Sequence, residues 1–310
     1  MLVETPPREI ADNLWMLGTT QYPLYLFRGQ KYGTIFEGGT GAMGPVLREQ
    51  MQTLGIDGDS VKQVVVTHAH PDHVMAVPLF RDLFPEVSVL ASESASKTLS
   101  AEKAISFFVK MDDALTASLI GNGVIQDEYR RPPMTDSHIA VDRILRAGDT
   151  IEVDEGVVFQ VLETPGHSEC SLSFHEPNGK VLIISDATGY YLPQEQYWWP
   201  NYFSGYGAYV DSIECLANKG AEVLCLSHNA VIQGASDVAA YFRNSLDATR
   251  QYHNRIVNET KAGKTTREIA HTLGEEVFQK TPLFPVEFFQ KNCGLLAKLS
   301  LAHEGIREEK

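Results

Sequence analysis

The chain has 310 residues, of which 43% are hydrophobic and 21% are charged, so it can bury a large core. Its 40 acidic and 26 basic side chains leave a formal net charge of −14. That balance argues against a nucleic-acid surface, which needs a dense cationic face, and against an anionic membrane surface, so we expect no nucleic-acid partner and no membrane partner. An anionic small molecule is not excluded, because a bound metal cluster can dominate the local field.

The cysteines and the apolar runs indicate the compartment. Four cysteines lie far apart without a C-x-x-C pair, which is typical of reduced thiols in a cytosolic protein. Residues 1–15 contain early acids and prolines and lack the apolar region of a signal peptide. No apolar run approaches the roughly 20 residues needed to span a bilayer. We therefore expect a cytoplasmic protein.

The first third of the chain predicts alternating strands and helices. Runs of aromatic and β-branched residues predict strands at 22–28, 32–39, 61–67 and 87–92. Apolar residues at helical spacing predict helices at 44–54 and at 74–84, the second ending before a proline. The order is therefore hairpin, helix, strand, helix, strand.

The middle of the chain predicts a helical insertion followed by a second group of strands. Residues from about 93 to 140 form the insertion, and its first part, 93–120, is rich in helix-forming residues. Strand-like composition returns at 151–164, 170–176, 180–186 and 221–228. Tight turns join several of these runs, which favours two sheets with helices outside over a doubly wound sheet.

The last part of the chain predicts helices only. Apolar residues recur at helical intervals from residue 236, and Thr265 and Glu268 are in capping-box register for a further helix. A third helix is predicted from about residue 285 to 303. We therefore expect a catalytic domain over 1–235 and a helical extension over 236–310.

The densest group of titratable side chains follows the buried strand 61–67, in the stretch VVVTHAHPDHVMAV. It forms the pattern H-x-H-x-D-H with His68, His70, Asp72 and His73. Alternate residues after a strand point the same way, so the first two histidines can approach one ion, and the turn that follows can aim the next two residues at a neighbouring ion. Imidazole and carboxylate ligands suit zinc, iron or manganese. Without a cation, grouping them here would cost desolvation energy.

Three more groups of ligand type follow apolar strands later in the chain. His167 lies between two strands, Asp186 ends the strand 180–186, and His228 ends the strand 221–228. Singly, each is explained as a turn histidine or a helix cap, but together with the first motif they predict a binuclear site. Water shared by two cations has a lowered pKa, so a bridging hydroxide can attack a carbonyl near neutral pH, and Asp72 can orient it.

These motifs together resemble a known superfamily. The set T-H-A-H-P-D-H, T-P-G-H-S, S-D-A and L-S-H, in this order over about residues 10–235, resembles the metallo-β-lactamase-fold hydrolases. The resemblance implies an α/β fold, an αββα sandwich of two mixed β-sheets flanked by helices. It also implies two divalent metal ions, with zinc first and iron or manganese as alternatives. By the same resemblance the first metal is held by His68, His70 and His167, the second by Asp72, His73 and His228, and both by a bridging Asp186.

A finer resemblance concerns the substrate. The N-terminal N-L-W-M-L-G…Y-P-L-Y-L-F-R hairpin, the F-E-G-G turn, V-L-A-S-E and the helical extension are similar to the thioesterases of bacterial quinolone signalling. This implies hydrolysis of a small acyl thioester. The alternatives are hydrolysis of a lactone or other ester with the same metals, and a signalling protein that uses the metal domain as a scaffold. The C-terminal helices, with PLFPVEFF at 282–289, offer a surface for a homodimer or a protein partner.

An aromatic segment follows the predicted bridging aspartate. Residues 190–209 include nine aromatic side chains, which can form a wall for an aromatic or acyl group, or equally a buried loop or a dimer contact. By analogy with similar lactonases, Tyr190 or Tyr191 can donate a hydrogen bond to the substrate carbonyl. Arg130 and Arg131 are candidate contacts for a coenzyme A leaving group, although exposed arginines are more often simply solvated.

Overall fold

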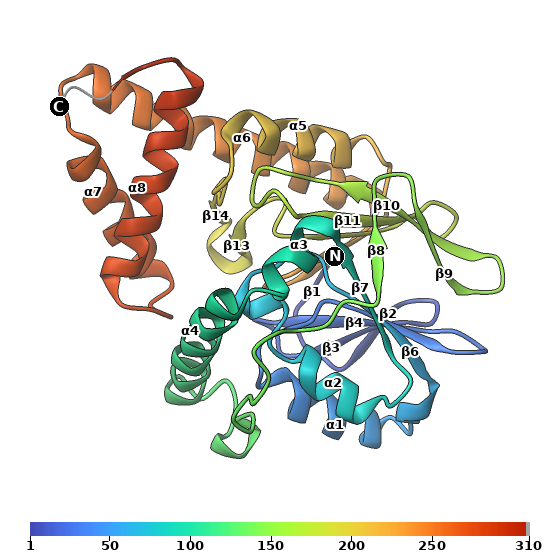
Figure 1. Cartoon of the computed structure of the whole chain (residues 1–310). Coiled ribbons are helices and arrows are strands. Elements are labelled where there is room, and N and C mark those ends of the chain that lie inside the picture. Colours follow the sequence, from blue (N-terminus) through green and yellow to red (C-terminus); the bar gives the residue numbers. More distant parts are fainter. Residues whose placement is uncertain (308–310) are drawn as a thin grey trace. The chain divides into compact units, whose positions relative to one another are not determined.

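The computed structural model describes residues 1–307 (Figure 1). Its chain divides into two compact units. The first unit contains residues 1–163, 170–185 and 219–238. The second contains residues 164–169 and 186–218, together with the chain from residue 239 onward. The boundary expected between residues 235 and 236 falls at the first turn of helix α6 (Ala235–Lys261), and the second unit also takes in two earlier segments.

The first unit is built on two seven-stranded mixed sheets. One sheet has the order β2-β3-β4-β5-β6-β7-β8, antiparallel from β2 to β5 and parallel from β5 to β8. Its strands are β2 (Arg8–Ala11), β3 (Leu14–Gly18), β4 (Pro23–Arg28), β5 (Gly33–Phe36), β6 (Val61–Val65), β7 (Ser88–Ser92) and β8 (Arg143–Leu145). The metal motif follows β6, an interior strand of this sheet.

The other sheet has the order β1-β16-β15-β12-β11-β10-β9, and only its β12–β15 pair is parallel. Its strands are β1 (Leu2–Val3), β9 (Thr150–Asp154), β10 (Val157–Glu163), β11 (Leu172–Glu176), β12 (Val181–Ser185), β15 (Val223–Leu226) and β16 (Val231–Gln233). The run expected at 151–164 is thus two strands, because Gly156 turns the chain with a left-handed φ of +75°.

Helices cover the outer side of the β2–β8 sheet, where α1 and α2 run along its face (Figure 1). The helices of the first unit are α1 (Met43–Thr53), α2 (Val77–Leu83), α3 (Glu93–Leu99) and α4 (Glu102–Gly121). Short 3₁₀ helices occur along the chain at η1 (Gly58–Ser60), η2 (Pro71–His73), η3 (Asp127–Tyr129) and η4 (Pro193–Glu195). The insertion expected at about 93–140 therefore contains α3, α4 and η3.

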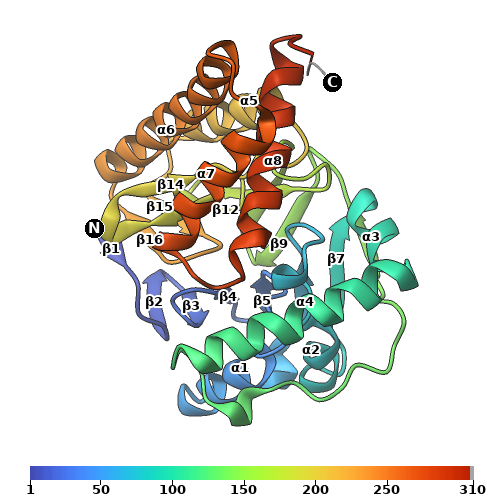
Figure 2. The same ribbon diagram turned by 90° about the vertical axis from the view of Figure 1, so that its left-hand side faces the viewer.

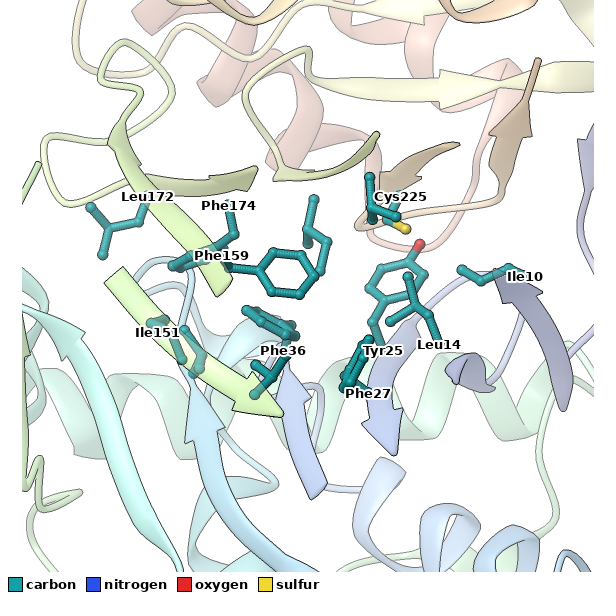
Figure 3. Close-up of a cluster of buried hydrophobic side chains, with 14 of the residues drawn as sticks. Ile10, Leu14, Tyr25, Phe27, Phe36, Ile151, Phe159, Leu172, Phe174 and Cys225 are labelled. Atoms are coloured by element: carbon teal, nitrogen blue, oxygen red, sulfur yellow. The ribbon is translucent and has the colours of Figure 1, made fainter. Parts of the chain in front are cut away.

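The main core lies between the two sheets of the first unit (Figure 3). The Phe36 ring of β5 packs 4.8 Å from Phe159 of β10 and 5.2 Å from Phe174 of β11, centroid to centroid. The buried hydroxyl of Tyr25 on β4 donates to the carbonyl of Leu226 on β15. Burial raises the pKa of Tyr25 well above its ordinary value, so this hydroxyl stays a donor at neutral pH. The two sheets are thus joined by aromatic packing and by a hydrogen bond close to the end of β15.

The second unit is mainly helical. It contains the hairpin β13 (Tyr190–Leu192) and β14 (Tyr197–Trp199), followed by α5 (Tyr206–Ala217), most of α6, α7 (Thr266–Lys280) and α8 (Val286–His303). The expected capping box begins α7, because Thr265 Oγ1 accepts from the Glu268 N–H and the Glu268 carboxylate accepts from the Thr265 N–H. Helices α7 and α8 lie side by side (Figure 2). None of the described helices is long and apolar enough to cross a membrane.

Candidate metal centre

The loop after β6 carries the first four predicted ligands. Two backbone contacts hold it, because the Thr67 carbonyl accepts from the Leu172 N–H at 2.8 Å and the Cys170 Sγ accepts from the Ala69 N–H at 3.3 Å. The β6 strand supplies a rigid start, and η2 then turns the chain. His68 and His73 are buried as a result, while Asp72 keeps 27% of its side chain exposed.

The first pair of ligand atoms comes from His68 and His70. The Nε2 of His68 lies 3.0 Å from the Nδ1 of His70. The opposite nitrogen of the His68 ring, Nδ1, lies 3.1 Å from the hydroxyl of Ser185, the last residue of β12. Because that hydroxyl holds the Nδ1 side, the Nε2 lone pair is directed toward His70.

A second group forms from Asp72, His73 and His228, whose ligand atoms lie within 4.8 Å of one another. The Oδ2 of Asp72 is 3.4 Å from the Nε2 of His73 and 3.7 Å from the Nε2 of His228. The other ring nitrogens have acceptors, since the Nδ1 of His73 lies 2.9 Å from Glu37 Oε2 and that of His228 lies 2.9 Å from the Gln21 carbonyl oxygen. Both imidazoles therefore present Nε2 to the same carboxylate.

A third pair, His167 and Asp186, lies in the second unit. The Nε2 of His167 is 3.3 Å from Asp186 Oδ2, and its Nδ1 is 2.8 Å from the Asn201 carbonyl oxygen. Both side chains are buried. Gly166 allows this loop to pass, because a Cβ there would lie 2.3 Å from the Tyr209 backbone and its φ is +122°. The ring is thus anchored in the same way as the histidines of the first unit.

The spacing and anchoring of these side chains fit a divalent metal ion. Ligand atoms around a tetrahedral zinc lie about 3.3 Å apart when each bond is about 2.0–2.1 Å long. The four pairs above are separated by 3.0, 3.3, 3.4 and 3.7 Å. Histidine ligands also commonly donate their second N–H to a carboxylate, carbonyl or hydroxyl, which fixes the tautomer that leaves a lone pair for the metal. Nitrogen and oxygen donors without a thiolate suit zinc, iron or manganese.

One buried carboxylate connects two of these histidines. Glu37 follows β5 with a left-handed φ of +81°, and its Oε2 accepts from the Thr67 hydroxyl at 2.9 Å as well as from His73. The Thr67 oxygen in turn accepts from the Ser185 hydroxyl at 2.8 Å, and Ser185 faces His68. A continuous hydrogen-bond path therefore runs from His68 to Glu37, where it meets the contact to His73.

The predicted tyrosines lie on the β13–β14 hairpin. Tyr190 is paired in register with Trp199, and Tyr191 is paired with Trp198. The buried Tyr191 ring stacks on Trp198 at 4.3 Å and meets Tyr241 edge-on at 5.2 Å. Tyr190 is only half-buried. The Tyr191 ring therefore belongs to an aromatic cluster, and Tyr190 is the more accessible of the two.

The two arginines predicted to contact a coenzyme A leaving group differ in burial and in ion pairing. The guanidinium of Arg131 keeps only 5% exposure and lies 2.6 Å from Asp112 Oδ2 and 2.9 Å from Asp113 Oδ1. Burial raises the pKa of Asp112, and the Gly41 N–H and Arg131 act in the opposite direction. Arg130 is largely exposed and pairs with Asp127 at 2.9 Å. Arg131 thus has a structural role in tying the loop after α4 to that helix.

The groups that anchor the histidine rings were not predicted from the sequence. Glu37 stands in the F-E-G-G turn directly after a strand, as the predicted ligands also do. Its position could therefore have marked it as part of the site. Ser185 precedes Asp186 and had no such signal. The carbonyls of Gln21 and Asn201 are backbone groups, and no residue type marks them.

Comparison with known proteins gives a family model and several relatives. The model of the Metallo-beta-lactamase superfamily matches residues 17–228. The uncharacterized protein YobT of Bacillus subtilis is 25% identical over 188 residues, which are 58% of this chain and 72% of that protein. The "Probable metallo-hydrolase YqjP" of the same organism is 28% identical over 166 residues, 51% of this chain and 50% of that protein. A linear primary-alkylsulfatase of a Pseudomonas species is 24% identical over 238 residues, 69% of this chain and 43% of that enzyme. The chain thus spans half or less of the length of the last two relatives.

Solved structures show the same fold. The metallo-beta-lactamase family protein TTHA1429 of Thermus thermophilus has a TM-score of 0.65 and 22% identity, covering 96% of this chain and 95% of its own. The subclass B3 metallo-beta-lactamase BJP-1 of Bradyrhizobium japonicum has a TM-score of 0.57 and 17% identity, covering 84% and 98%. These likenesses confirm the predicted fold of two mixed sheets with helices and a C-terminal helical region.

Proposed function

The chain belongs to the metallo-beta-lactamase superfamily as one of its metallo-hydrolases, and we propose that it holds two divalent metal ions and hydrolyses a small acyl thioester. One observation carries the metal site in this proposal. Each of four histidines has an oxygen atom within hydrogen-bond distance of its Nδ1, while its Nε2 faces another histidine or a carboxylate; they are His68, His73, His167 and His228. Such preorganisation is typical of a metal site and has no purpose in a merely solvated loop.

We assign the ligands as the resemblance implies. One ion is assigned to His68, His70 and His167, the other to Asp72, His73 and His228, and Asp186 is assigned to both. Chain connectivity supports this assignment, because Asp186 directly follows Ser185, whose hydroxyl faces His68. Zinc is the first choice of metal, with iron or manganese as alternatives that the same donors accept.

Each side chain has a task in the proposed reaction. Metal ions held by these residues would lower the pKa of water and polarise a carbonyl, so that a nucleophile would be available near neutral pH. Asp72 is partly exposed, and its carboxylate can accept a proton from the attacking water and so orient it. Tyr190 can donate a hydrogen bond to the carbonyl oxygen as negative charge develops there. Water then adds to the acyl carbon, the C–S bond breaks, and a carboxylate and a thiol leave.

The thioester is favoured by the similarity to the quinolone-signalling thioesterases in the N-terminal hairpin and the helical extension. The aromatic cluster around Tyr191 and Trp198 follows the predicted bridging aspartate directly and is suited to contact an acyl or aromatic group. A lactone or another ester is the alternative with the same chemistry. The alkylsulfatase relative adds a sulfate ester to the substrates worth testing.

Metal analysis coupled to a substrate screen tests the proposal. We expect two ions per chain after metal-replete purification, and fastest turnover on the thioester among a thioester, a lactone, an oxygen ester and an alkyl sulfate with the same acyl or alkyl length. His228→Ala should lose metal and turnover, whereas His138→Ala, an exposed histidine outside the motifs, should keep both. Fewer than one ion per chain would contradict the metal centre, and turnover of the lactone alone would contradict only the thioester.

Two further variants separate the roles of the tyrosines and of the scaffold. Tyr190→Phe should lower kcat with little change in fold, whereas Tyr191→Phe should have the smaller effect because its ring is already packed. Equal activity of Tyr190→Phe and the unmodified protein would remove Tyr190 from the mechanism. If a folded Asp186→Ala variant without turnover keeps the full biological output, the scaffold alternative replaces the enzymatic one.

A further inference from the structure

A basic cavity lies in the second unit, between the α6–α7 turn and the C-terminal part of α8. Its volume is about 840 Å³. Among the described residues, five cationic side chains line it: Lys261, Lys264, Arg267, Lys298 and Arg307. None of them belongs to the metal motifs, and none is assigned a role in the proposed reaction.

Three separate segments bring these cations together. Helix α6 ends at Lys261, and Gly263, with a φ of +91°, turns the chain toward the start of α7. After α8, Gly305 has a φ of +67° and the Ile306 N–H donates to the Leu301 carbonyl, which returns the chain so that Arg307 reaches the cavity.

Small side chains leave room between the two helices that border the cavity. A Cβ built on Gly294 of α8 would lie 3.5 Å from the Cβ of Ala270 on α7. Both residues line the cavity. The space is therefore a consequence of how α7 packs on α8 and does not depend on one flexible side chain.

Within residues 1–307 most of the charge in this cavity is not paired. The described residues that line it include no acidic residue, although the whole chain has a formal net charge of −14. Lys264 pairs with Glu259 at 3.1 Å, but the other four cations make no ion pair within residues 1–307. The nearest acid in sequence to Arg267, Glu268, already accepts from Thr265 as the cap of α7. Gathering like charges costs repulsion energy that a bound anion would remove.

We propose that this cavity binds a small molecule that carries two or more phosphate groups. Several cations around one cavity match several negative charges better than a single carboxylate does, and arginine can bind a phosphate through two parallel hydrogen bonds. The Thr266 hydroxyl adds a further donor to the lining, whereas the Thr260 hydroxyl already donates to the Ile256 carbonyl at 2.9 Å. A long polyanion is disfavoured, because it would extend beyond the cavity onto an acidic protein. The volume lies within the range of about 300–1,000 Å³ that is usual for small-molecule sites.

Calorimetric titration of the full chain with inorganic triphosphate and with ADP tests this site. We expect saturable binding at one site per chain, weakened by added salt because the attraction is electrostatic. The double variant Arg267→Gln/Lys298→Gln should weaken binding by about tenfold or more, which corresponds to roughly 1.4 kcal/mol. The control Arg243→Gln/Lys291→Gln removes the same charge from exposed positions of α6 and α8 outside the cavity, and should change the Kd by less than about twofold.

Four outcomes would overturn the proposal. They are the absence of saturable triphosphate binding, equal weakening by the cavity and control variants, binding that the cavity variant leaves unchanged, and tighter binding of an acidic peptide of matched charge. The third outcome would place the anion elsewhere, for example at the metal centre. The thermal unfolding of each variant shows whether it is folded. Because the readout is binding, failure of this site and failure of the proposed hydrolase are distinguishable.

Discussion

The carboxylate of Glu37 is the most informative side-chain group to change near the metal centre. It is buried, with 2% exposure, and its Oε2 accepts from His73 and from Thr67, both at 2.9 Å. Through Thr67 and Ser185 it also supports the ring of His68. We predict that Glu37→Gln weakens metal binding without altering any proposed ligand.

The expected size of the effect follows from the two hydrogen bonds. A bond to a charged acceptor is worth about 1 kcal/mol more than a bond to a neutral one, so the two bonds together lose about 2 kcal/mol, or roughly 30-fold in metal affinity. Within residues 1–307 the other oxygen, Oε1, has no hydrogen-bond partner. The new amide nitrogen would occupy that position unsatisfied, which adds a folding cost of about 1–3 kcal/mol. Thermal stability of the metal-free protein should therefore fall as well.

Competition with a chromogenic chelator measures the metal affinity. At pH 7.5 and at a temperature far below the melting temperature, this measurement is separate from the stability of the fold. The matched control is Glu155→Gln, whose side chain is 87% exposed and which should bind metal like the unmodified protein. A folded Glu37→Gln variant with a metal affinity within about twofold of the unmodified protein would refute the idea that this carboxylate supports the rings, since loss of such a partner typically costs about 10- to 100-fold.

Three further predictions concern stability and the loop that carries the ligands. Gly38→Ala should lower metal content, because its Cβ would lie 2.4 Å from the His73 carbonyl oxygen and displace that turn; metal analysis checks it. Arg131→Gln should cost about 3–5 kcal/mol in denaturant unfolding, because it leaves Asp112 buried without its cation. Burial lowers the pKa of His253, against the opposing effect of a glutamate, so the unfolded state binds the proton more readily. The stabilising contribution of neutral His253 is present above a pH of about 6.5 and is lost as the pH falls below it. The His253→Phe variant should therefore lose less stability than the unmodified protein on acidification from pH 7.5 to 5.5.

Each of these predictions has a control variant. Gly121→Ala adds a Cβ where no atom lies within 4 Å, so it should keep the metal content. Arg130→Gln removes an exposed pair next to Arg131 and should cost less than about 1 kcal/mol. His271→Phe is the control for His253→Phe, because it replaces an exposed histidine of α7 to which the burial argument does not apply. If a control behaved like its partner variant, the stated physical reason would be wrong.

The sheet strands with long apolar runs could be predicted, and the short ones could not. The four apolar residues at 181–184 appear in β12, and the run expected at 61–67 appears as β6, although Lys62 and Gln63 stand between its valines. The strands β13 and β14 have three residues each within the aromatic segment, and their pairing depends on ring stacking that local composition does not reveal. Short strands of this kind depend on the neighbours that they contact.

Residue type and spacing were enough to indicate which side chains of ligand type stand at strand ends and in what order, because ligand chemistry is a property of the side chain. They were also enough to indicate the superfamily and the metal-ligand candidates. The anchoring of the rings, by contrast, depends on contacts between residues far apart in the chain. Glu37 and His73 are 36 residues apart and meet because β5 pairs with β6, whereas Gln21 and His228 are 207 apart and meet only where the two sheets pack. The basic cavity is also a product of packing, because its five cations come from three separate segments and attract an anion only once α7, α8 and the turns beside them hold them together.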